Sequence, residues 1–266
     1  MKKAIVFMIC ALLITSIMAA KVRYESHLQT GGANAAIRVE NVEYIRDGIK
    51  AAYPQLIAAV ENDSIKRINE LILADFNRIL QIYAFNPFMQ PAPAPTQAAN
   101  IPVILNISYQ IKLNAPEYIS ILYFAAYNSP YAAHPTELVY TTNIDRESGR
   151  RLTLGDIVRL DTDFAENFKN WSPVNENKYP EYIIQGIMDY ISGLSNEDLL
   201  SGMKAADIIG SGNLLNIFSY LTDDRLGISI GLPNYLGDHA EFEMDYASLS
   251  PYLDPLFYRS VVGIHE

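Results

Sequence analysis

Residues 118–157 read YISILYFAAYNSPYAAHPTELVYTTNIDRESGRRLTLGDI, and this stretch decides the fold. The apolar run at 118–127 predicts a strand that is covered on both faces. A loop with a single histidine, His134, separates it from 136–145, where the side chains alternate in character as in a half-buried strand. The strand at 118–127 is therefore expected to be central in a sheet, and to form a hairpin with 103–113 across Asn114–Glu117.

The segments on both sides of this stretch add helices and further strands. A helix is predicted over 62–83, because Asn-Asp-Ser opens it and apolar residues then recur with three-four spacing. Pro54 is expected to end the strand region before it, because proline has no N–H for a ladder. The other predicted strands lie within 37–53, 103–113, 216–221, 225–232 and 239–246, and the other predicted helices within 163–171, 178–208 and 248–253. We therefore predict an α+β fold with antiparallel sheets and packed helices, in which two sequential subdomains form one compact body.

Changes in composition divide the chain into successive segments. The expected segments are a signal peptide or N-terminal anchor at 1–20, a tether at 21–36, an N-terminal α+β subdomain at 37–145 with a Pro-rich loop at 86–102, a C-terminal α+β subdomain at 146–258, and a tail at 259–266. The dense prolines exclude a helix or a central strand from the loop. The tether is expected because its sequence has no periodicity.

The N-terminus has the pattern of an export signal. Two lysines precede the run 4–20, which is apolar apart from a Thr-Ser pair. The run is slightly shorter than the about 20 apolar residues of a membrane-spanning helix. We expect an extracytoplasmic location, which is periplasmic, cell-surface or secreted, with an uncleaved anchor as the alternative to cleavage. The only cysteine, Cys10, lies in this run, so the rest of the chain is expected to fold without disulfides.

The charge balance narrows the classes of partner. The chain has 20 Lys and Arg residues against 30 Asp and Glu residues, a formal charge of −10. Removal of the two lysines in the expected signal leaves 18 against 30, or −12. An acidic surface repels nucleic acid and anionic lipid headgroups, so we expect no nucleic-acid partner and membrane contact only through 4–20 if that run is uncleaved. It favours a basic protein as a partner, although simple solubility also explains the charge.

Common catalytic signatures are absent from the sequence. It contains no Gly-x-Ser-x-Gly elbow, no His-Glu-x-x-His zinc helix, no phosphate-binding glycine loop and no dinucleotide fingerprint. We therefore expect no cofactor, no metal and no catalytic residue, and a non-catalytic role is favoured over an enzymatic one.

Two groups of residues remain as candidate binding positions. His134 lies between two strands, where it binds a ligand or only hydrogen-bonds its own loop. On the last predicted strand, alternation places His239, Glu241, Glu243 and Asp245 on one face. A row of carboxylates grips a cation or a basic protein surface, but it is also typical of the solvated face of an amphipathic strand.

An ordered set of short motifs resembles a known bacterial domain pair. The motifs are Tyr53-Pro54-Gln55-Leu56 with Ile68-Asn69, Ser120-Ile121, Tyr127, Ala132-Ala133-His134, Thr142-Asn143-Ile144-Asp145, Gly149, Leu152–Asp156, Phe218 with Leu221–Asp224, Leu226, Pro233, Tyr235 and Tyr246–Leu249. Over residues 37–258 they resemble the extracytoplasmic domains of unknown function of RsiV-like lysozyme-binding anti-sigma factors and PdaC-like peptidoglycan deacetylases. The chain departs from that pattern at Pro130-Tyr131 and at Leu236–Ala240.

The resemblance implies a function at the cell envelope. It implies an exported, non-catalytic binding module whose partner is a basic protein such as a lysozyme-like muramidase, or a peptidoglycan fragment of the cell wall. Two alternatives remain open. One is a hydrolase of cell-wall material that uses His134 or His239 with nearby carboxylates, and the other is a structural envelope protein.

Overall fold

The computed structural model describes most of the chain and shows an α+β fold. The described residues are 24–27, 37–46, 48–58, 62–84, 104–128, 134–174 and 179–262. The expected signal segment at 1–20 and the Pro-rich loop at 86–102 lie outside the described residues. Within the described ranges, no helix combines the length and the apolar character that crossing a bilayer requires.

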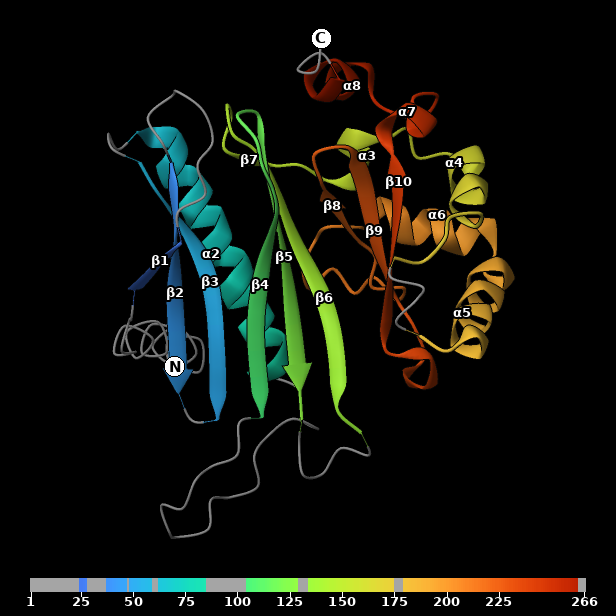
Figure 1. Cartoon of the computed structure of the whole chain (residues 1–266), viewed down its shortest axis with the longest axis horizontal. Helices are drawn as coiled ribbons and strands as arrows, with labels where there is room; N and C mark the ends of the chain where they lie inside the picture. Colours follow the sequence, from blue (N-terminus) through green and yellow to red (C-terminus); the bar gives the residue numbers. More distant parts are fainter. Residues whose placement is uncertain are drawn as a thin grey trace, which may run out of the picture.

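A seven-stranded sheet forms one side of the protein, with its strands in sequence order (Figure 1). The strands are β1 (Tyr24–His27), β2 (Arg38–Arg46), β3 (Ile49–Ile57), β4 (Leu105–Asn114), β5 (Tyr118–Tyr127), β6 (Thr136–Asp145) and β7 (Arg150–Arg151). Neighbours pair antiparallel, except that β3 and β4 are parallel over Ile49–Ala51 and Leu105–Ile107. The predicted strands at 118–127 and 136–145 are confirmed at both ends.

Helix α2 (Asp63–Ala84) covers one face of this large sheet and lies behind its strands in Figure 1. The backbone N–H of Ile65 donates to Oδ1 of Asn62 (2.9 Å), so Asn62 is the N-cap. The buried stripe of the helix consists of Ile65, Ile68, Ile72, Phe76, Ile79 and Tyr83. These side chains pack with Ile121 and Tyr123 of β5. The predicted helix at 62–83 is therefore confirmed.

Strand β3 continues through Pro54, which pairs with Asn41 of β2, so the expectation that proline ends this strand was wrong. Past its first three residues, β3 has no strand partner on the β4 side. There the N–H of Leu56 donates to Oδ1 of Asn69 (2.8 Å), and Nδ2 of Asn69 donates to the Leu56 carbonyl (2.9 Å). N–H groups two residues apart point to the same edge, so the missing N–H of Pro54 removes no ladder hydrogen bond.

A second, three-stranded antiparallel sheet has the order β10-β9-β8. Its strands are β8 (Phe218–Leu221), β9 (Arg225–Gly231) and β10 (His239–Asp245). Its helices are α3 (Leu154–Ile157), α4 (Thr162–Phe168), α5 (Glu181–Gly193), α6 (Asn196–Lys204), the 3-10 helix η4 (Asn234–Leu236), α7 (Tyr246–Leu249) and α8 (Pro255–Val262). In Figure 1, α4, α5 and α6 lie on the side of this small sheet that faces away from the large sheet. The helical content predicted within 178–208 is confirmed, and it consists of two helices, α5 and α6, with a break after Gly193.

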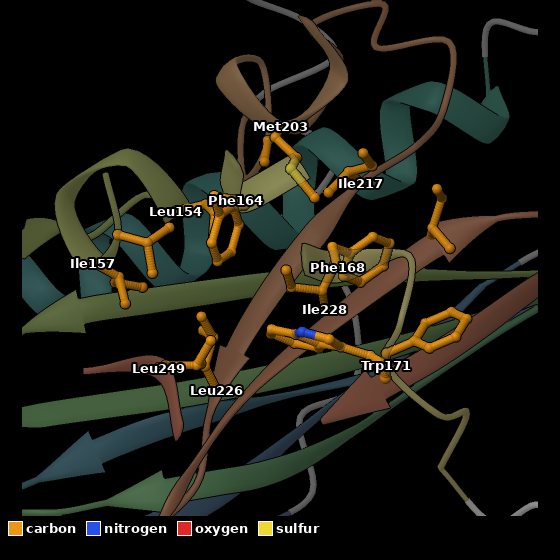
Figure 2. Packing of buried hydrophobic residues seen from close by; sticks show 14 of the residues in the cluster. Leu154, Ile157, Phe164, Phe168, Trp171, Met203, Ile217, Leu226, Ile228 and Leu249 are labelled. Carbon is orange, nitrogen blue, oxygen red and sulfur yellow. The ribbon is translucent and has the colours of Figure 1, made fainter. Parts of the chain in front are cut away.

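The helices and the small sheet share an aromatic core, part of which Figure 2 shows. The ring centroid of Phe168 lies 5.3 Å from that of Trp171 and 5.2 Å from that of Phe242. The indole N–H of Trp171 donates to Oδ1 of Asn167 (2.9 Å), so the buried ring leaves no donor unpaired. Ile228 of β9 packs in the same cluster. This core holds one face of the small sheet against its helices.

Two boundaries differ from the sequence-based expectation. Residues 21–36 were expected to be a tether, but Tyr24–His27 forms β1 and pairs with β2. The tail was expected to begin at residue 259, but α8 continues to Val262 and buries Val261. Both segments are short, so neither shows a clear periodic pattern in the sequence.

The other face of the large sheet meets the small sheet in a polar seam. On the free edge of β8, the N–H of Leu221 donates to Oγ of Ser120 (3.0 Å), and the N–H of Ser219 donates to Oδ1 of Asp207 (2.6 Å). Oγ of Ser120 in turn donates to Oδ1 of Asn143 (2.7 Å). The unpaired backbone groups of the edge strand are thus satisfied by side chains rather than by a further strand.

Candidate functional site

A cavity of about 250 Å³ lies between the two sheets, away from the closed part of the seam. Its wall on the large sheet consists of Gln110, Lys112, Phe124 and Glu137. Its wall on the small-sheet side consists of His239, Ala240, Glu241, Pro173, Val174, Tyr179 and Ile187. The lining is more polar than apolar, with Phe124 and Ile187 as apolar walls, so the cavity is a candidate site for a polar ligand.

The strand register explains why the cavity lies at this end of the seam. Ser120 pairs with Asn143 where the two sheets hydrogen-bond directly, whereas Ala126 pairs with Glu137 at the far end of the same two strands. On β4, Tyr109 and Ile111 pack toward α2. Alternation therefore turns the side chains of the intervening strand positions toward the small sheet and into the cavity.

Lys112 joins the two sheets at the inner wall of the cavity. Its Nζ lies 3.7 Å from a carboxylate oxygen of Glu241 and 3.7 Å from one of Glu243. The same Nζ lies 4.2 Å from the centroid of the Tyr220 ring, an arrangement typical of a cation–π contact. All of the charged side chains in this cluster are less than one fifth exposed. The side chains of Glu241 and Glu243 on β10 therefore point between the two sheets, where Lys112 partly neutralises their charge. They form neither an open cation-binding surface nor a solvated face.

Tyr220 completes this cluster from β8. Its hydroxyl donates to Oε1 of Glu243 (2.8 Å). Burial raises the pKa of Tyr220, and the carboxylates of Glu241 and Glu243 raise it further, so the hydroxyl remains a donor. The ring lies over Gly227, where a Cβ would overlap it. A glycine is therefore required opposite this tyrosine.

His239 occupies the outer wall of the cavity. Its Nδ1 lies 3.2 Å from the backbone carbonyl of Glu137. Because a carbonyl oxygen only accepts, this hydrogen bond requires the proton on Nδ1 and leaves Nε2 as an acceptor in the neutral ring. The N–H of Glu137 donates to Oδ2 of Asp238 (2.9 Å), so β6 is held to the η4–β10 turn from both sides.

The sequence-predicted site residues do not all come together. His239 and Glu241 line the cavity, and Glu243 contacts Lys112 beside it. His134 is exposed, and its Nδ1 lies 3.1 Å from the carbonyl of Pro135, in its own loop. Asp245 caps α7 by accepting from the Ser248 N–H (2.8 Å), and this hydrogen bond lowers the pKa of Asp245. The last two residues therefore have local structural contacts outside the cavity.

Several cavity residues were not singled out from the sequence. Gln110 and Lys112 lie on the polar face of β4, and their alternation with apolar neighbours was the available signal. Tyr179 and Ile187 come from the segment that leads into α5 and from α5 itself. They reach the cavity only because the small sheet is placed against the large one, which no local pattern reveals.

A buried carboxylate, Asp207, was also missed and has a structural role. Its carboxylate accepts from Oγ of Ser219 (2.7 Å), the N–H of Leu154 (2.7 Å) and Oγ1 of Thr141 (3.3 Å), in addition to the Ser219 N–H. Burial raises the pKa of Asp207 to about 6, although these donors oppose the shift. Each carboxylate oxygen of Asp207 accepts two hydrogen bonds from groups of the protein. Asp207 therefore stabilises the seam and has no free acceptor for a ligand.

The chemistry available in the cavity is hydrogen bonding. Gln110 both donates and accepts, Glu137 accepts, and Nε2 of His239 accepts. None of the described residues that line the cavity is a serine, threonine or cysteine. Among the described residues, no group of three or more His, Cys, Asp or Glu side chains is placed to hold a metal ion.

Two crystal structures of DUF3298 family proteins are similar to this chain. One, from Bacteroides fragilis, is 15% identical, and the match covers 90% of this chain and 96% of that chain with a TM-score of 0.41. The other, from Pseudomonas aeruginosa, is 12% identical, and the match covers 90% of this chain and 95% of that chain with a TM-score of 0.44. No protein-family model and no curated protein matches the sequence. DUF3298 denotes a domain of unknown function, and at this level of similarity the two structures assign no activity to this chain.

Proposed function

We propose that the protein is an exported, non-catalytic binding module of the bacterial cell envelope, and that it holds a cell-wall fragment in the cavity between its two sheets. The observation that carries this proposal is the cavity itself. Gln110, Glu137 and His239 present unsatisfied hydrogen-bonding capacity there, between the apolar walls of Phe124 and Ile187. A neutral or weakly charged polar ligand fits such a lining.

The envelope location is supported by two features of the sequence. The lysine-led apolar run at 4–20 is typical of a secretory signal. The ordered motifs over 37–258 resemble RsiV-like and PdaC-like extracytoplasmic domains, which act on or beside the cell wall. A ligand derived from the wall is therefore a ligand that this protein would meet.

A basic muramidase is the competing partner, and the position of the β10 carboxylates argues against it. Glu241 and Glu243 are ion-paired with Lys112 inside the seam, so they offer little surface for steering a cationic protein. The overall charge of −10 remains favourable to such a partner. Binding that collapses with added salt would identify the muramidase, because exposed charge pairs are screened within about 8 Å at physiological ionic strength.

The hydrolase alternative depends on one observation, which is that His239 and two carboxylates share the cavity. Glu241 is held by Lys112, and His134 does not line the cavity. Release of soluble products from purified cell walls, abolished by His239→Ala, would establish this alternative in place of the proposed binding role.

The test is a binding measurement with soluble peptidoglycan fragments, by calorimetry, on protein purified from cells that express the full chain. His239→Ala and Gln110→Ala should each weaken binding by about tenfold, the equivalent of about 1.4 kcal/mol for one lost hydrogen bond in a concave site. His134→Ala is the matched control, since it removes the same side chain from an exposed loop outside the cavity. Equal binding by all three variants, or no binding by the unaltered protein, would contradict the proposal.

A further inference from the structure

Three exposed tyrosines among the described residues lie in segments that also contribute, or lead into, the lining of the cavity. Tyr179 lines the cavity, Tyr182 lies in the first turn of α5, and Tyr235 lies in η4. Their exposed fractions are 46%, 74% and 73%. Every other tyrosine whose exposure is described is buried or half-buried. Three large aromatic side chains that are exposed on neighbouring segments indicate a surface that is used for binding.

The helices that carry Tyr182 and Tyr235, α5 and η4, pack against each other. Tyr182 lies four residues before Gly186, and residues with this spacing share a face of a helix. A Cβ on Gly186 would lie 2.8 Å from Cδ2 of Leu236, so α5 and η4 pack closely at this point. Tyr235 adjoins Leu236 in the same short helix. The two segments that carry Tyr182 and Tyr235 are therefore packed against each other.

The turn that follows η4 connects this contact to the cavity. Gly237 and Asp238 have φ values of 104° and 67°, in the left-handed region, and reverse the chain into β10. The next residue, His239, lines the cavity, as does Ile187 of α5. The segments that carry Tyr182 and Tyr235 therefore lead directly into the cavity wall, to which Tyr179 also belongs.

Polar side chains surround the three rings. Asn234 donates to Oδ1 of Asp238 (3.0 Å), and Gln185 donates to Oδ1 of Asp189 (2.8 Å), all at exposed positions. Glu181 is exposed beside Tyr182. A protein–protein hot spot needs a contiguous apolar centre that is poor in charged residues, and this surface has none. The acidic groups also disfavour nucleic acid or any other polyanion whose rings would stack on tyrosine.

We propose that the cavity and the three tyrosines together bind a saccharide chain, with one sugar ring in the cavity and the following rings against Tyr179, Tyr182 and Tyr235. A pyranose has an apolar C–H face, which packs on a tyrosine ring, and an edge of hydroxyl groups, which bind polar neighbours. The cavity volume of about 250 Å³ lies below the roughly 300–1,000 Å³ of sites for drug-sized ligands, so it suits a single ring. This inference rests on the proposed function, because the cavity supplies the first subsite.

The experiment compares N-acetylglucosamine with its linear tetramer by calorimetry, using protein from cells that express the full chain. The tetramer should bind at least about tenfold more tightly, because its outer rings reach the tyrosines. Tyr182→Ala and Tyr235→Ala should each lose about three- to tenfold in tetramer affinity and leave monosaccharide affinity unchanged. Tyr182→Phe and Tyr235→Phe should retain most of the affinity, since they keep the ring.

Leu256→Ala is the control for removal of an exposed apolar side chain, because Leu256 is exposed on α8, and it should leave binding unchanged. Raising the salt concentration to 0.5 M should also leave saccharide binding unchanged. Equal affinity for monomer and tetramer, or tetramer binding that both alanine variants retain, overturns the role of the tyrosines and leaves the cavity proposal standing. Binding of peptidoglycan stem peptides without binding of either sugar overturns the saccharide inference alone, and binding of none of these probes overturns the proposed function as well.

Discussion

The two ends of the seam between the sheets differ in how their polar groups are satisfied. At the closed end, Ser120, Asn143, Ser219 and Asp207 are hydrogen-bonded to one another and to backbone groups. At the open end, the side chains of Gln110, Glu137 and His239 line a cavity, and only Nδ1 of His239 hydrogen-bonds across the gap, to the Glu137 carbonyl. The two sheets are therefore held together by hydrogen bonds at one end of the seam and enclose a candidate binding site at the other end.

This difference distinguishes polar residues that stabilise the fold from polar residues that are candidates for ligand binding. A buried polar group that has all its partners stabilises the fold, and its removal leaves those partners unsatisfied. A polar group with spare capacity beside a cavity costs little to remove and changes binding instead. Substitutions at the closed end should therefore reduce stability, and substitutions at the open end should reduce affinity.

The largest expected effect is at Asp207. Asp207→Ala leaves the buried N–H groups of Leu154 and Ser219 without acceptors, and it should lower the free energy of unfolding by about 4 kcal/mol. Urea denaturation followed by circular dichroism measures this change. Asp189→Ala, at an exposed position on α5, is the control and should stay within about 0.5 kcal/mol. A loss of less than about 1 kcal/mol at Asp207 would break the distinction between the two ends.

The same carboxylate predicts a pH dependence of stability. Burial raises the pKa of Asp207 to about 6, so the folded state binds this proton more tightly than the unfolded state does. The free energy of unfolding should therefore fall by about 2 kcal/mol as the pH rises from about 4 to about 6. The lowered pKa of Asp245 has the opposite effect, but only below about pH 4. In Asp207→Asn the fall between pH 4 and 6 should be absent, and its persistence would assign the slope to other groups.

Gly227 provides the next test, where the seam passes from closed to open. Gly227→Ala places a methyl group in the Tyr220 ring, and the overpacking should cost about 2 kcal/mol in urea denaturation. Gly193→Ala is the matched control, because a Cβ there meets nothing within 4 Å. The control should be neutral or stabilising by up to about 1 kcal/mol. A neutral Gly227→Ala would mean that the Tyr220 ring does not need this space.

The smallest expected change in stability is at Lys112. Lys112→Met removes the cation between Glu241 and Glu243, and it should cost about 1 kcal/mol at neutral pH because two half-buried carboxylates then face each other. Lys66→Met, on the exposed face of α2, should change stability by less than about 0.5 kcal/mol. Lys112→Arg keeps the positive charge beside the two glutamates and should retain most of the stability. An equal cost for Lys112→Arg and Lys112→Met would show that packing, not charge, explains the loss.

Sequence patterns located most of the elements correctly. The three-four spacing of α2 and the alternation of β6 were confirmed. The strands predicted within 216–221 and 225–232 were also confirmed, as β8 and β9, which pair antiparallel. These features depend on residues close together in the chain, which is why they were accessible.

The candidate site was predicted only in part. Alternation correctly grouped His239, Glu241 and Glu243 on one face of β10, but it did not reveal that Lys112 of the large sheet covers that face. His134 and Asp245 were chosen by residue type, and their contacts are local. A strand pattern shows which side chains share a face, and it contains no information on what lies opposite.

By itself, the sequence determined the periodic elements, their caps and the acidic charge of the chain, because these depend on neighbours in sequence or on composition. Tertiary structure alone decided which faces meet, and therefore that Asp207 is buried with Thr141, 66 positions away, and that the carboxylates of β10 face Lys112. The physical reason is that a polar group between two sheets is tolerated only with a partner across the gap. Those partners come from distant parts of the chain, as Lys112 of β4 and the carboxylates of β10 show.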